Sequence, residues 1–190
     1  MKSLEEIKAI RKRLEGFIAE RPEGSKETRI VVGMATCGIA SGARPVLDAI
    51  TEEVVRHDLS HVVVMQTGCI GLCQYEPVVE VYEPGKDKVT YIKMNPGKAA
   101  EIVEQHIMGG KLVENYMLHE KEGNACLRSL NESVFYKNQE RIALRNCGVI
   151  DPEKIDEYIA TGGYEAIRKV LTEMTPDEVI QTILDSGLRG

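Results

Sequence analysis

The chain has 190 residues, of which 43% are hydrophobic, and its formal net charge is -6. A chain of this length and composition can bury one core of ordinary size and a small second unit. Acidic and basic residues are mixed along the sequence, so no basic stripe is available for phosphates and nucleic acid is not an expected partner. No apolar run approaches the roughly 20 residues that span a bilayer, so we expect a cytoplasmic protein with no membrane span.

The first predicted element is an amphipathic helix. Ser3 and Glu6 form a capping-box pattern, and apolar residues recur at helical spacing from Leu4 to Ile18. We therefore assign residues 1–27 to an N-terminal helix and to the turn that ends it.

Residues 28–110 carry the signals of a small α/β domain. The expected elements are strands at 30–32, 62–65, 78–82 and 88–92 and helices entered at Pro45 and Pro96. The last two strands flank Pro84 and Gly85, which is the turn chemistry of a hairpin. This order of elements predicts a mixed four-stranded sheet with flanking helices.

The remaining sequence divides into a connector and a helical segment. Residues 111–146 are polar with weak periodicity, and we assign them as a linker. Residues 147–190 then show three short helical patterns, at 155–159, 164–171 and 179–184, separated by glycine and proline signals. Three such helices bury little apolar surface alone, so we expect them to pack on something larger.

Three of the five cysteines follow predicted strands. Cys37 follows the first strand, and Cys69 and Cys73 follow the second, with Gly68 and Gly71 around them. Loops after neighbouring strands can meet at one edge of a sheet, and glycines let the backbone fold tightly around a cluster that thiolates hold. The pattern favours an iron-sulfur or zinc site, with simple interior packing of three small thiols as the alternative.

At these cysteines, residues 28–110 resemble the thioredoxin-like [2Fe-2S] ferredoxins. The resemblance implies a [2Fe-2S] cluster with Cys37, Cys69 and Cys73 as ligands, and two cysteines from each loop. The fourth cysteine would fall near Val32, where none stands. Other candidates for the fourth ligand are a second chain or one of the following residues: Ser41, Asp48, His57, His61 and Cys126.

A second resemblance lies at the C-terminal end. The segments Arg145-Asn146-Cys147-Gly148, Gly162-Gly163-Tyr164-Glu165 and Ser186-Gly187-Leu188-Arg189-Gly190 resemble the opening of the NADH-binding flavoprotein subunit of respiratory complex I and of NADH-dependent hydrogenases. This resemblance implies FMN and NADH in a parent subunit, at residues that these 190 do not include. It also implies other iron-sulfur and flavoprotein subunits as partners, and the sequence is compatible with a homo-oligomer as well.

Two functions therefore stand as hypotheses. The first is an electron-transfer part of an NADH-oxidising, multisubunit oxidoreductase, a part that has no catalytic residues of its own and is inactive alone. The second is a degenerate ferredoxin fold that serves as a docking domain without a cluster. A thiol-redox protein is a weaker third reading, because the Cys-x2-Cys motif of that activity is missing. The four scattered histidines form no triad or zinc signature.

Overall fold

The structure is a computed structural model that describes residues 3–18, 27–119, 126–127, 129 and 132–189. Its centre is a four-stranded sheet in the order β2-β1-β3-β4. The strands are β1 (Thr28–Gly33), β2 (Val62–Thr67), β3 (Val79–Tyr82) and β4 (Val89–Tyr91). β1 pairs in parallel with β2 and antiparallel with β3, which pairs antiparallel with β4. The predicted mixed four-stranded sheet is therefore confirmed.

The parallel pair of strands ends at one edge of the sheet. Gly33, the last residue of β1, is in register with Thr67, the last residue of β2. The pairing continues one residue further, where the Met34 amide donates a 2.9 Å hydrogen bond to the Thr67 carbonyl. Parallel strands run in the same direction, so the two segments that follow them leave from the same edge. Both segments carry cysteines.

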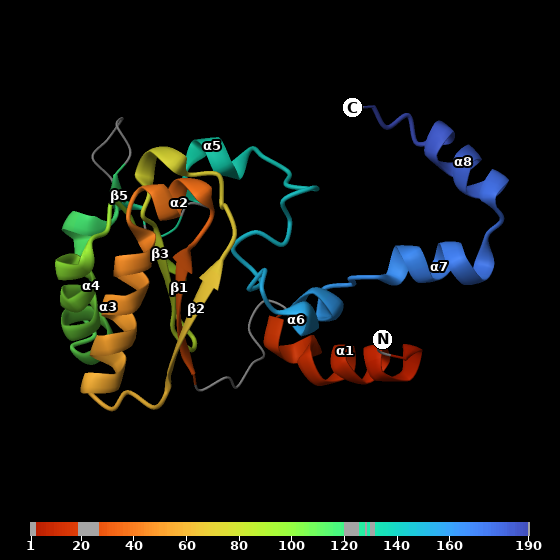
Figure 1. Cartoon of the computed structure of the whole chain (residues 1–190). Coiled ribbons are helices and arrows are strands. Elements are labelled where there is room, and N and C mark those ends of the chain that lie inside the picture. Colours follow the sequence, from red (N-terminus) through yellow and green to blue (C-terminus); the bar gives the residue numbers. More distant parts are fainter. Residues whose placement is uncertain (1–2, 19–26, 120–125, 128, 130–131, 190) are drawn as a thin grey trace.

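The main core lies between the sheet and two helices. Helices α3 (Ala43–Arg56) and α4 (Pro96–Ile102) pack side by side and cover the same face of the sheet (Figure 1). Ile30 and Val32 of β1 and Ile50 of α3 are completely buried there. β-branched side chains pack well on a pleated surface, which is why the sequence formed strands at these positions.

Several segments are more regular than the sequence predicted. The small-residue stretch after β1, expected as a loop, contains the short helix α2 (Thr36–Ala40), and α4 continues as the π-helix η2 (Val103–Met108). The segment assigned as a linker contains the following elements: the 3-10 helix η3 (Glu114–Tyr116), β5 (Leu118–His119), β6 (Cys126–Leu127) and α5 (Val134–Lys137). β5 and β6 form a separate antiparallel pair.

The C-terminal part contains the three predicted helices, α6 (Ile155–Ala160), α7 (Glu165–Glu173) and α8 (Pro176–Asp185). The N-terminal helix α1 (Leu4–Ile18) packs against α6, whereas α7 and α8 extend away from the sheet (Figure 1). The apolar side chains of α7 and α8 are correspondingly exposed, as at Leu171 with 76% and other positions above half.

Some expectations fall on parts of the chain that are not described. The predicted turn after α1 lies in residues 19–26, and Gly190 closes the flavoprotein-like segment, so both lie outside the described residues. Among the helices that the structure describes, none has both the length and the apolar character to cross a membrane.

Candidate metal centre

Cys37 lies in α2, at the edge of the sheet where β1 ends. Gly38 of this helix packs closely on the end of β1, since a Cβ on Gly38 would lie 2.4 Å from the Gly33 carbonyl oxygen. Such a contact excludes any side chain, so only glycine lets the backbone fold back here. The side chain of Cys37 is exposed at the end of the sheet.

The second segment folds tightly around Cys69. Gly71 has a φ of +88°, and its amide donates a 3.3 Å hydrogen bond to the Cys69 sulfur. The hydroxyl of Tyr136 donates a 3.1 Å hydrogen bond to the Ile70 carbonyl, and a Cβ on Gly71 would lie 3.1 Å from that hydroxyl. The loop therefore needs glycine at 71, for its positive φ and for the close approach of Tyr136.

Cys73 begins the 3-10 helix η1 (Cys73–Tyr75), and its thiol lies near enough to Cys37 and Cys69 for both to affect its pKa. A hydrogen bond with Cys37 and the charge of its thiolate raise the pKa of Cys73, slight desolvation adds to this, and a hydrogen bond with Cys69 acts in the opposite direction. The structure therefore brings Cys37 and Cys69 to Cys73 from two separate segments.

The donor set fits an iron-sulfur cluster in kind. Thiolates are the usual protein ligands of [2Fe-2S] clusters, and backbone amides such as that of Gly71 donate hydrogen bonds to ligand sulfurs. The set is one thiolate short of four. Among the described residues, no three histidine, cysteine, aspartate or glutamate side chains converge closely enough to hold a metal ion. The assignment of Cys37, Cys69 and Cys73 as ligands remains a prediction.

A buried carboxyl group lies behind this edge, and the sequence did not reveal it. Glu76 is 8% exposed, and its oxygens lie within 3.3 Å of the positions that a Cβ would take on Gly33 and Gly38. Burial raises the pKa of Glu76, and a 2.9 Å hydrogen bond from the Val78 amide partly offsets this. No sequence pattern marks a glutamate whose neighbours are glycines of a different strand and helix.

The other candidates for a fourth ligand lie in different places. His57 follows the C-terminal end of α3, and His61 precedes β2, so both lie at the opposite edge of the sheet. Cys126 packs against the main core, where its sulfur is 3.8 Å from that of Met117. The exposed side chains of Ser41 and Asp48 carry oxygen rather than sulfur ligands.

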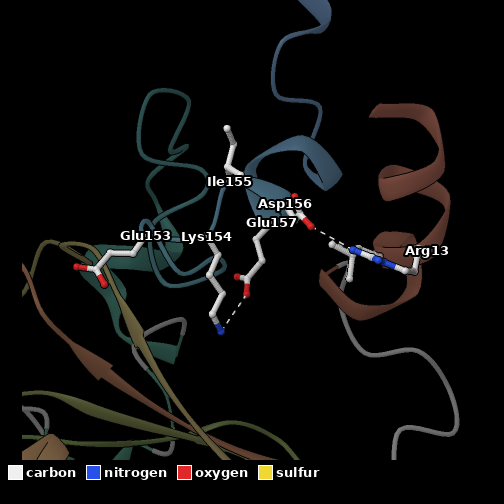
Figure 2. A pocket seen from close by; sticks show the side chains of 7 residues that line it. Arg13, Glu153, Lys154, Ile155, Asp156 and Glu157 are labelled. Atoms are coloured by element: carbon white, nitrogen blue, oxygen red, sulfur yellow. Dashed lines mark hydrogen bonds and ion pairs between the residues drawn. The ribbon is translucent and has the colours of Figure 1, made fainter. Parts of the chain in front are cut away.

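A separate hollow of about 470 Å³ lies between α1 and the start of α6 (Figure 2). It is lined by Leu14 and by charged side chains that include Arg13, Lys154, Asp156 and Glu157. Arg13 pairs with Asp156 at 3.1 Å, and Lys154 lies 3.7 Å from Glu157. These charges are matched within the chain, and the hollow contains no cysteine.

The sheet, its flanking helices and the thiols at one edge define a thioredoxin-like α/β protein of the ferredoxin class. Subunit HndB of the NADP-reducing hydrogenase of Solidesulfovibrio fructosivorans is 36% identical over 114 residues, which are 60% of this chain and 88% of HndB. A "Ferredoxin, 2Fe-2S" of Clostridium pasteurianum is 36% identical over 74 residues, which are 38% of this chain and 70% of that protein. The chain belongs to the family of these [2Fe-2S] ferredoxins and HndB.

A third relative bears on the flavoprotein-like resemblance. Subunit HndC of the same hydrogenase is 65% identical over 54 residues, which are 28% of this chain and only 11% of HndC. The expected similarity to a hydrogenase subunit is therefore confirmed, over a small part of that subunit. No family profile matches the chain.

Proposed function

We propose that the chain is an electron-transfer part of an NAD(P)H-linked, multisubunit oxidoreductase of the hydrogenase type, with a [2Fe-2S] cluster bound through Cys37, Cys69 and Cys73. One observation carries the proposal: Cys37, Cys69 and Cys73 lie in the two segments that leave the same edge of the sheet, in a chain that belongs to a ferredoxin family. Such a cluster, when bound, takes up one electron and releases one electron.

The protein groups around the thiols suit this role. Cys37 and Cys73 are exposed, so a cluster held by them lies at the surface, where an electron donor and an acceptor can approach. The Gly71 amide that donates to the Cys69 sulfur stabilises added negative charge, which favours the reduced state.

The relatives support a proposal about the partners, and the thiols support one about the compartment. HndB and HndC are named as subunits of one hydrogenase, so iron-sulfur and flavoprotein subunits are the expected partners of this chain. FMN and NADH would be bound by such a flavoprotein, where they would supply electrons to iron-sulfur centres one at a time. The thiols of Cys37, Cys69 and Cys73 are free, as the reducing cytoplasm favours.

Anaerobic reconstitution of the whole chain with ferrous iron and sulfide tests the proposal. We expect about two iron atoms per chain, a visible spectrum that bleaches with dithionite, and an electron paramagnetic resonance signal in the reduced state. Cys69→Ser should lose most of this iron, and Cys126→Ser, away from the site, should keep it. A wild-type chain with no iron, no sulfide and no signal contradicts the proposal.

The second candidate is a docking domain without a cluster. It is favoured by the missing cysteine at Val32 and by the lack of three converging ligand side chains among the described residues. The same reconstitution separates the two functions. A docking domain takes up no stoichiometric iron, and its Cys69→Ser variant still binds the partner subunits.

A further inference from the structure

A segment from outside the predicted ferredoxin domain lies on the cysteine loop. The Gly148 amide donates a 2.9 Å hydrogen bond to the Thr67 hydroxyl, and this hydroxyl donates a 3.1 Å hydrogen bond to the Ile150 carbonyl. Thr67 is the last residue of β2, directly before the loop that contains Cys69. In Figure 1 the connector between α5 and α6 passes beside the end of β2.

A third contact fixes the same segment on the sheet. The Tyr82 hydroxyl lies 3.4 Å from the Gly148 carbonyl and donates a 2.9 Å hydrogen bond to Glu80. Gly148 has a φ of +83°, and a Cβ there would lie 3.1 Å from the Ile70 side chain. A larger residue at 148 would push the segment off the loop, so glycine allows this close approach.

These contacts bring the sulfur of Cys147 to the loop that contains Cys69. The sulfur is 4.0 Å from the position that a Cβ would take on Gly68, and Gly148 lies against Ile70. Gly68 and Ile70 are the two chain neighbours of Cys69, so Cys147 and Gly148 contact the residues on either side of it. The Cys147 thiol is free and half-buried.

We propose that Cys147 supplies the fourth thiolate of the [2Fe-2S] site, in place of the cysteine missing at Val32. The inference rests on the proposed function, because it needs a cluster at Cys37, Cys69 and Cys73. Cys147 offers the sulfur donor that the cluster prefers, whereas His57, His61 and Cys126 lie elsewhere in the fold. A cluster bound in this way ties the flavoprotein-like segment to the ferredoxin domain.

The test compares four proteins after anaerobic reconstitution with ferrous iron and sulfide: wild type, Cys147→Ser, Cys69→Ser and Cys126→Ser. Iron content, the reduced electron paramagnetic resonance spectrum and the rate of iron release to a chelator are measured. We expect Cys147→Ser to shift the spectrum and to release iron at least about tenfold faster, because losing a ligand costs no less than losing a contact that supports a ligand. Cys126→Ser should match the wild type.

A second measurement covers the case in which Cys147→Ser does not fold. Wild-type chain is treated with iodoacetamide, with and without iron, and the labelled cysteines are identified by mass spectrometry. Cys147 should be protected only when iron is present. Equal labelling in both states overturns the inference, and so does a Cys147→Ser protein with the iron content, spectrum and rate of iron release of the wild type. In that case the loss of iron from Cys69→Ser still supports the proposed function. A wild-type chain that binds no iron overturns both.

Discussion

The phenol of Tyr91 and Nδ1 of His106 are joined by a 2.9 Å hydrogen bond in the interior, between β4 and η2. Nε2 of the same imidazole is 3.0 Å from a carboxylate oxygen of Glu83. Burial raises the pKa of Tyr91 to about 12, so the phenol stays protonated and donates to Nδ1. A neutral imidazole with its proton on Nε2 then donates to Glu83, and all three groups are satisfied.

This buried chain predicts a loss of stability in mild acid. Burial lowers the pKa of His106 from 6.5, although Glu83 partly offsets it. As the pH falls, the unfolded chain takes up this proton before the folded chain does. The contribution of neutral His106 to the free energy of unfolding is therefore complete above about pH 6.5 and is lost as the pH falls through the folded pKa. The free energy of unfolding, measured with urea from pH 7.5 to 5.5, should fall by up to about 1.4 kcal/mol per pH unit for this proton.

Two histidine variants isolate this effect. His106→Gln should lose about 1–3 kcal/mol at pH 7.5, because Tyr91 and Glu83 lose a well-placed partner, and its stability should depend less on pH. His119→Gln, at an exposed position in β5, should keep the wild-type pH dependence. An unchanged slope in His106→Gln assigns the acid sensitivity to other groups.

The close approach at α2 predicts that Gly38→Ala is strongly destabilising. The added Cβ would meet the Gly33 carbonyl oxygen at 2.4 Å and a Glu76 oxygen at 3.2 Å, and the backbone partner cannot rotate away. We expect a loss of about 1–3 kcal/mol in the free energy of unfolding, together with displacement of Cys37. Gly97→Ala in α4 is the matched control, since its nearest neighbour lies at 3.4 Å and alanine favours a helix. Equal stabilities for the two variants would contradict the role of Gly38.

The Thr67 hydroxyl predicts how firmly residues 146–150 are held on the cysteine loop. Thr67→Val keeps the size of the side chain but removes the acceptor for the Gly148 amide and the donor to the Ile150 carbonyl. The unfolding free energy should fall by about 1–3 kcal/mol, since buried groups lose their partners. Amide hydrogen exchange at Gly148 should become faster in Thr67→Val and remain slow in Thr67→Ser, which keeps the hydroxyl. Equally slow exchange in Thr67→Val means that other contacts hold the segment.

Elements with a local cause were predictable from the sequence. The β-branched runs at Ile30–Val32 and Val62–Met65 became β1 and β2, and the apolar spacing after Thr175 became α8, which begins with a capping box to Glu178. The meeting of Cys37 with the Cys69 and Cys73 loop also follows from a simple rule, because parallel strands end at the same edge.

Features that depend on distant partners were not predictable. Helix α2 has little apolar periodicity, and it forms where Gly38 packs on Gly33 and Glu76. No sequence pattern distinguishes His106 from the other three histidines, because its contact with Glu83, 23 residues earlier, forms only in the fold. Cys147 stands alone in the sequence, and only the fold brings it beside Gly68. In each case the missing information is a tertiary contact that no local pattern encodes.

The docking of α1 on α6 provides a last prediction. Two nitrogens of Arg11 donate hydrogen bonds of 3.3 and 3.4 Å to the Ile159 carbonyl near the C-terminal end of α6, and a third pairs with Glu165. Arg13 makes one ion pair with Asp156, and its side chain is 66% exposed. Arg11→Ala should therefore open the α1–α6 contact at a cost of about 1–3 kcal/mol, whereas Arg13→Ala should cost less than about 1 kcal/mol. Hydrogen exchange of the α1 and α6 amides measures the opening in both variants.

Arg11→Lys keeps the charge but loses the planar fork, so the exchange rate of its amides should lie between those of wild type and Arg11→Ala. A larger effect from Arg13→Ala than from Arg11→Ala would show that the exposed ion pair, not the carbonyl contact, holds the helix.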